Sequence, residues 1–188
     1  TYTVGEFKVA TRKTASIENY AIRLKDAIDI VREKTGEEEI ILIAHSMGGL
    51  VAREYLHLFE DEHVPLLITL GTPNHGVEAG VRRYCTLTGA QQECEEMAQG
   101  STFLERLNAP TAWPANTDIY TIAATGCDTK TEAGSIEAGD GVVLARSVAL
   151  ERAVENRVVH GSCTDALQKS LHMDFVNPSQ YPQTYEMI

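Results

Sequence analysis

Residues 37–55 have the sequence EEEIILIAHSMGGLVAREY, which predicts a strand, a sharp turn and a helix. The residues Ile40–Ala44 can fill a buried strand, and a helix with apolar periodicity follows the turn. A turn of this kind needs small residues on both sides of Ser46, and Ala44 and Gly48 meet that need. The turn raises the serine hydroxyl above the sheet. We therefore predict that Ser46 is a nucleophile and not an ordinary helix-capping serine.

A serine hydroxyl is a weak nucleophile at neutral pH and needs help from its surroundings. An imidazole must accept its proton, and a carboxylate must orient that imidazole. A backbone N–H must also stabilise the oxyanion that forms, and the start of a helix adds partial positive charge there. Met47 follows the serine at this helix start and is the predicted oxyanion donor.

From this turn onward the chain resembles the bacterial lipases and esterases of the α/β-hydrolase superfamily. Four further segments look like segments of those enzymes, in the same order: Leu66–Gly76, Ser101–Asn108, Gly139–Val143 and Leu171–Asn177. The resemblance covers the chain from about Ser16. It implies an α/β fold with a mostly parallel sheet flanked by helices. We expect a single domain over residues 1–188, with a candidate cap or lid at about 76–115.

Three residues follow the chain order serine, acid, histidine that this fold implies: Ser46, Asp140 and His172. Asp140 lies in Gly-Asp-Gly-Val-Val, which resembles the acid-bearing segment of the lipases, and His172 lies in a loop beyond the last predicted strand. Each of the three follows a predicted strand, so all can meet at one edge of the sheet. Asp128 directly follows another predicted strand and is the competing acid.

Five other histidines compete with His172 for the role of base. His45 adjoins the serine, and its side chain should project away from the hydroxyl, so we expect it to pack or to brace the turn. His75 is expected to line the cleft without acting as the base. The remaining three are expected to be solvated or to belong to a strand: His57, His63 and His160.

The composition excludes several classes of partner. With 188 residues, 43% apolar content and a net charge of −11 spread along the chain, the sequence argues against nucleic acid and anionic membranes. No stretch approaches the roughly twenty apolar residues of a membrane span, while contact with a lipid interface through a lid stays open. The expected partner is a small-molecule or lipid ester, with no cofactor. Asp174 matches a calcium position of some larger lipases, but one carboxylate does not make a site for calcium, and no metal is predicted.

Four cysteines bear on the cellular compartment. Neither a Cys-x-x-Cys motif nor a cluster at zinc spacing occurs, which favours two local disulfides. The most economical of the three pairings is Cys85 with Cys94 and Cys127 with Cys163. This predicts an oxidising compartment and hence a secreted or extracytoplasmic protein. Four reduced, buried cysteines are the alternative.

Apolar periodicity, together with residues that begin or end helices, predicts the remaining elements. A helix is expected from Ser16, its N-cap, to Gly36, its stop. Strands are expected at Thr1–Ala10, Pro65–Leu70, Asp118–Ala124 and Asn156–His160. The apolar residues of the candidate lid serve equally well as a buried helix face: Leu87, Met97, Phe103, Leu104 and Leu107.

These patterns predict a serine hydrolase that cleaves carboxylic esters of lipids or small acyl compounds through an acyl-enzyme intermediate. The same residue types also serve acyltransferases, thioesterases and lipid-anchor deacylases. In the lipases that the chain resembles, an earlier strand ends in a His-Gly loop that supplies an oxyanion N–H, and no such motif precedes Ser16. We therefore expect a fold that lacks its N-terminal strands. A catalytically weak or non-catalytic truncated domain is the third hypothesis.

Overall fold

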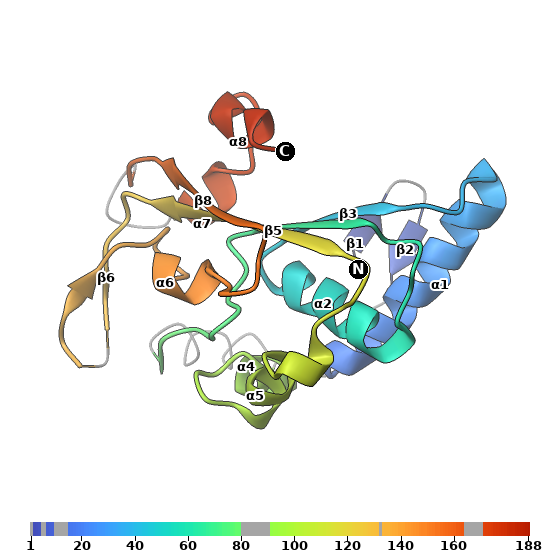
Figure 1. Cartoon of the computed structure of the whole chain (residues 1–188). Coiled ribbons are helices and arrows are strands. Elements are labelled where there is room, and N and C mark those ends of the chain that lie inside the picture. Colours follow the sequence, from blue (N-terminus) through green and yellow to red (C-terminus); the bar gives the residue numbers. More distant parts are fainter. Residues whose placement is uncertain (1, 5–6, 10–14, 80–90, 132, 164–170) are drawn as a thin grey trace.

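A four-stranded parallel sheet forms the centre of the computed structural model (Figure 1). The structure describes six ranges of the chain: residues 2–4, 7–9, 15–79, 91–131, 133–163 and 171–188. The strands lie in the order β3-β4-β5-β8, and their bounds are Ile41–His45, Leu66–Leu70, Asp118–Thr125 and Glu155–His160. The parallel sheet predicted from the sequence is therefore confirmed.

Helices cover both faces of this sheet. Successive residues of each strand point to opposite faces, so each strand supplies apolar side chains to both. On one face, Leu67 and Ile119 pack against the long helices α1 and α2. On the other face, Ile68 and Ile122 pack against the segment that contains the short helix α7. Figure 1 shows α1 and α2 below the sheet and α8 above it. The bounds of these helices are Ile17–Thr35 for α1, Met47–Phe59 for α2, Leu171–Asp174 for α7 and Pro182–Glu186 for α8.

Helix α1 begins and ends where the sequence predicts. The Ser16 hydroxyl accepts a hydrogen bond from the backbone N–H of Asn19 at 3.1 Å, as an N-cap does. At the other end Gly36 has φ of 75°, and its N–H donates to the carbonyl of Arg32 at 2.9 Å. Local signals at both ends therefore set this helix.

Two strand predictions need correction. The single strand predicted over Thr1–Ala10 consists of two short strands, β1 (Tyr2–Val4) and β2 (Phe7–Val9), which pair with each other in antiparallel fashion. Both arms of a hairpin show the same alternation, so periodicity does not reveal where the chain reverses. Strand β3 is also less buried than predicted: Ile41 and Ile43 are 58% and 54% exposed. Among the described residues β3 is an edge strand, and α7 on that face packs against β5.

The segment expected to form a lid contains short helices. They are α4 (Gln91–Glu96), α5 (Thr102–Leu107) and the 3₁₀-helix η1 (Pro110–Ala112). Phe103, Leu104 and Leu107 are buried against Ile17 and Leu50, so these three form a buried helix face. Leu87 lies outside the described residues. Whether the segment caps the cleft stays a prediction.

The long connection between β5 and β8 also has structure of its own. It holds a small hairpin of β6 (Thr129–Lys130) and β7 (Ile136–Glu137), followed by α6 (Ala145–Val148). Hairpin strands of two residues are too short to show alternation.

One of the two predicted disulfides is present. Cys127 and Cys163 are bonded to each other and tie the connection after β5 to the segment after β8. Cys85 lies outside the described residues, so its pairing with Cys94 stays a prediction. Within the described ranges, no helix is both long and apolar enough to cross a membrane.

Candidate active site

Three polar side chains from distant parts of the chain form one continuous hydrogen-bonded series. The Nε2 atom of His172 lies 2.8 Å from Oγ of Ser46, and its Nδ1 atom lies 2.7 Å from Oδ2 of Asp140. Ser46 follows β3, Asp140 belongs to the connection after β5, and His172 follows β8. They meet at the carboxyl edge of the sheet, where the loops after parallel strands converge. This arrangement can move a proton from the hydroxyl to the imidazole.

Ser46 has a backbone conformation that few non-glycine residues adopt. Its φ is 56° and its ψ is −133°, at a cost of about 1–3 kcal/mol. Three bonds hold it: its N–H donates to the carbonyl of Leu70 at 2.8 Å, and its carbonyl accepts from Thr72 Oγ1 at 2.9 Å and from Gly49 N–H at 3.0 Å. A Cβ atom on Gly49 would lie 2.0 Å from Thr72 Oγ1. The close packing of α2 on Thr72 therefore requires glycine at position 49.

Met47, the predicted oxyanion donor, is the first residue of α2. In the described part of the chain no acceptor is bonded to its backbone N–H. Its side chain is partly buried and packs against the apolar cluster that contains Phe103 and Leu104. The N–H is therefore open to a ligand at the helix start, and its role as an oxyanion donor stays a prediction.

Asp140 is the carboxylate that reaches the histidine. It is 0% exposed, and its Oδ1 atom accepts from the N–H groups of Val142 at 2.9 Å and Val143 at 2.7 Å. A buried carboxylate needs such donors to offset its lost hydration. The competing acid, Asp128, is exposed. The structure thus brings Asp140 and not Asp128 to His172.

His172 lies in the one-turn helix α7 and not in a loop, which corrects the sequence prediction. The N–H of Phe175 donates to the carbonyl of Leu171 at 2.9 Å, and both side chains are buried against the sheet. Four residues are too few for helical periodicity, so this turn depends on tertiary packing. His172 itself is 5% exposed, which shields its bonds from water.

A family model for the alpha/beta hydrolase fold matches residues 8–123. The chain belongs to this α/β-hydrolase family. No curated protein sequence matches it.

Solved structures of this α/β-hydrolase fold resemble the chain at low sequence identity. The mature lipase BlEst2 from Bacillus licheniformis is 18% identical with a TM-score of 0.65, over 92% of this chain and 72% of the lipase. The phospholipase PlaB from Legionella pneumophila, in complex with thio-NAD, is 18% identical with a TM-score of 0.59, over 72% of this chain and 33% of the phospholipase. A lipase-esterase related protein from Clostridium acetobutylicum is 11% identical with a TM-score of 0.52, over 97% and 79%. The chain therefore spans about a third of the phospholipase, and the likeness shows the fold.

Sequence reasoning missed two neighbours of the series, which follow β4. Gly71 has φ of 56°, and a Cβ atom there would lie 3.2 Å from both Asp140 Oδ2 and the His172 ring. Thr72 bonds to the serine carbonyl, as described above. The signal was a glycine directly after a buried strand, where a side chain would crowd whatever lies at the carboxyl edge.

His45 lies closest to the series among the other histidines of this α/β hydrolase. Its Nε2 atom is 2.8 Å from the carbonyl oxygen of His172, and the two ring centroids are 4.6 Å apart. Burial, and next the charge of the neighbouring His172, lower the pKa of His45 from 6.5 to about 4. The ring packs, as expected, but it packs against His172 in α7.

The other four histidines make no contact with the series in the described structure. His75 Nε2 donates to the carbonyl of Ala149 at 3.0 Å, and His160 Nδ1 lies 2.9 Å from Thr125 Oγ1. His57 lies on α2, and His63 is exposed.

No metal centre is evident in the part of the chain that the structure describes. Among these described residues, no group of three or more histidine, cysteine, aspartate or glutamate side chains could hold a metal ion. The carbonyl of Asp174, the residue weighed for calcium, accepts from Asn177 N–H at 2.9 Å and closes the turn after α7.

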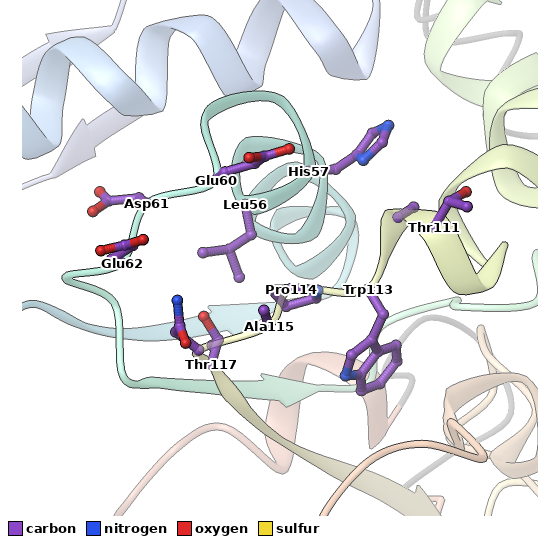
Figure 2. A pocket seen from close by; sticks show the side chains of 12 residues that line it. Leu56, His57, Glu60, Asp61, Glu62, Thr111, Trp113, Pro114, Ala115 and Thr117 are labelled. Carbon is purple, nitrogen blue, oxygen red and sulfur yellow. The ribbon is translucent and has the colours of Figure 1, made fainter.

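A hollow of about 280 Å³ lies away from the series, between the end of α2 and residues 111–117 (Figure 2). These residues precede β4 and β5, so the hollow lies at the amino edge of the sheet. Trp113 lines it, packs partly against the core and carries Arg152 over its ring at 5.1 Å. The tryptophan thus serves packing.

Proposed function

We propose that this chain is a serine hydrolase that cleaves carboxylic esters of lipids or small acyl compounds. The observation that carries the proposal is the series Ser46–His172–Asp140, with separations of 2.8 and 2.7 Å at its two links. A neutral imidazole that bonds both a hydroxyl and a buried carboxylate is arranged to act as a general base. The strained serine backbone adds to this support, because it aims the hydroxyl away from the sheet.

The reaction begins when Ser46 Oγ attacks the acyl carbon and His172 Nε2 takes its proton. Asp140 holds the Nδ1–H and stabilises the resulting imidazolium. The oxyanion lies toward the Met47 N–H at the start of α2. His172 then gives the proton to the departing alcohol, which leaves an acyl-serine. Water repeats the sequence: it loses a proton to His172, attacks the acyl carbon and releases the acid, while the serine recovers its proton.

The substrate class rests on the fold relatives. The similar structures include a lipase, a phospholipase and a lipase-esterase related protein. All three names point to esters, which supports an ester as the substrate of this chain. Because the identities are 11–18%, acyl length and head group are left to measurement. A panel of short- and long-chain nitrophenyl esters measures the acyl preference.

A fluorophosphonate probe tests the nucleophile directly. Intact mass should show one adduct on the folded chain and none on Ser46→Ala. Ser101→Ala is the matched control, because Ser101 precedes α5 as an ordinary N-cap with φ of −65°; it should be labelled like the wild type. A folded wild-type chain that stays unlabelled while a known serine hydrolase reacts would refute the proposal.

Transfer to an alcohol is the rival chemistry for the same series. An added alcohol acceptor with nitrophenyl ester as donor distinguishes the two outcomes by product analysis. Free acid as the main product supports hydrolysis. A new ester as the main product, at low acceptor concentration, would replace the hydrolase proposal with an acyltransferase.

The disulfide supports a proposed extracytoplasmic location. Cys127–Cys163 is the kind of bond that persists in oxidising compartments. Maleimide labelling of protein from its native source should leave both cysteines unmodified until a reductant is added. Labelling without reductant would contradict the location.

A further inference from the structure

His45 has no part in the proton transfers described above, yet its ring touches the residue that performs them. Its Nε2 atom lies 2.8 Å from the carbonyl oxygen of His172. The ring centroids of His45 and His172 are 4.6 Å apart with an angle of 40° between the planes, and those of His45 and Phe175 are 5.9 Å apart with an angle of 66°. We infer that His45 is a positioning residue, which holds α7 so that His172 stays within reach of Ser46. This inference rests on the proposed function.

The carbonyl of His172 needs a donor from outside its own helix. In a longer helix it would accept from the N–H of Val176. Helix α7 ends at Asp174, and no backbone hydrogen bond among the described residues reaches this carbonyl. Leaving a buried acceptor unbonded costs about 1–3 kcal/mol. The His45 ring supplies the missing donor.

The peptide group of His172 is therefore held on both sides. Its N–H donates to the Asp140 carbonyl at 3.0 Å, and its carbonyl accepts from His45. His45 immediately precedes Ser46, whose N–H is bonded to Leu70 in β4. The same piece of sheet backbone thus carries the nucleophile and holds the base. The distance between Ser46 and His172 is set by the sheet as well as by α7.

The bond to a carbonyl requires that His45 carry a hydrogen on Nε2. Burial, and next the charge of the neighbouring His172, lower the pKa of His45 to about 4, and they outweigh the bond to the His172 carbonyl and the charge of Asp140, which raise it. The ring is therefore neutral at pH 7 and donates its hydrogen without adding a charge. When His172 becomes an imidazolium during the reaction, its aromatic neighbour adds no like charge beside it.

Two substitutions separate the hydrogen bond from ring packing. His45→Phe keeps an aromatic ring against His172 but removes the donor, whereas His45→Gln keeps a side-chain N–H that can reach the same carbonyl. We expect kcat to fall about 10- to 10²-fold in His45→Phe with KM nearly unchanged. His45→Gln should recover most of that loss. His160→Phe is the matched control, since His160 also ends a strand, and it should retain wild-type kcat.

Two kinetic outcomes would overturn the inference. Wild-type kcat in His45→Phe would show that the bond does not matter. A loss in His45→Gln as large as that in His45→Phe, or larger, would show that a donor at position 45 does not restore activity, and would remove the hydrogen bond as the reason for the loss.

Nitrogen NMR of the histidine rings tests the inference without an activity measurement. In the wild type, His45 should be neutral with its hydrogen on Nε2 at pH 7, and a hydrogen on Nδ1 would overturn the inference whether or not any variant folds. The His172 ring signals should move in His45→Phe and stay near their wild-type positions in His45→Gln. If the wild type binds no probe and cleaves no ester, the proposed function fails, while these signals still test the positioning role.

Discussion

The two edges of the central sheet carry similar residue types but differ in how those residues are connected. The amino edge has the hollow of about 280 Å³, lined by His57, Asp61 and Trp113 (Figure 2). The carboxyl edge has the series of Asp140, His172 and Ser46. A histidine and an aspartate are present at both. Only the carboxyl edge, within the described residues, joins them to each other and to a hydroxyl.

At the amino edge the carboxylate of Asp61 is bonded to two neighbouring side chains. Arg32 Nη1 lies 2.9 Å from Asp61 Oδ2, and Tyr55 also donates its hydroxyl to that carboxylate. Burial raises the pKa of Asp61, but the bonds from Arg32 and Tyr55 outweigh it, so the pKa lies below 3.8. The comparison shows that titratable side chains around a hollow need not be linked to one another. The proposed function therefore rests on the carboxyl edge, where hydrogen bonds join a carboxylate, an imidazole and a hydroxyl.

The sharpest test of this comparison removes one histidine from each edge. His172→Ala should lower kcat for ester hydrolysis by about 10⁶-fold, because the serine loses its base. His57→Ala should leave kcat/KM unchanged. Steady-state kinetics on one nitrophenyl ester measures both. Similar losses in the two variants would erase the distinction between the edges.

A second test compares the two acids that the sequence offered. Asp140→Asn should lower kcat by about 10⁴-fold, because the imidazole loses the partner that sets its tautomer. Asp128→Asn changes an exposed side chain and should keep wild-type kcat. If Asp128→Asn proved the more damaging, the acid would be reassigned, and the geometry at His172 would need another explanation.

A third test concerns how the carboxyl edge is held together. The disulfide closes a loop with a sequence separation of 36, and Cys127 N–H donates to the carbonyl of Gly139, next to Asp140. Replacing Cys127 and Cys163 by serine should lower the free energy of unfolding by about 4 kcal/mol on the chain-entropy estimate. Urea unfolding of the oxidised wild type and the double variant measures the difference. A loss below about 1 kcal/mol would mean that the bond adds little to this edge.

The smallest expected effect is a difference in how the edges respond to acid. His45 has a folded pKa of about 4 against 6.5 when unfolded, so the unfolded chain binds more protons between these values. The contribution of His45 to the free energy of unfolding is fully present above pH 6.5. It should fall as the pH drops toward 4, by about 1 kcal/mol per pH unit. The pKa of Asp61 is lowered from 3.8, so its contribution is lost only below that pH.

Thermal unfolding at pH 7, 6 and 5 measures the His45 contribution. His45→Gln lacks the titrating ring and should lose less stability over this range than the wild type. Parallel curves would show that His45 takes up a proton as easily in the folded chain as in the unfolded one.

Much of the fold could be predicted because its signals are local. The caps of α1 at Ser16 and Gly36 lie within one turn of the bonds that they make. The strand, turn and helix around Ser46 could be predicted from residues adjacent in sequence, although bonds with Leu70 and Thr72 also hold the turn. The order serine, aspartate, histidine then named the three side chains that the structure brings together, while their catalytic roles stay predictions.

Other features had no local signal. The exposure of Ile41 and Ile43 depends on what covers that face of β3. The one-turn helix α7 depends on the burial of Leu171 and Phe175. The need for glycine at position 71 depends on how closely the pair of Asp140 and His172 approaches.

The sequence by itself determined the α/β class, the strained serine turn and the residue types of the series, because apolar periodicity, small residues and helix caps act over a few positions. Only the tertiary structure decided which aspartate reaches His172 and where the His45 ring bonds. Those outcomes depend on distances between residues 32 to 127 positions apart. Such distances follow from packing the whole sheet and its helices, and no short stretch of sequence encodes them.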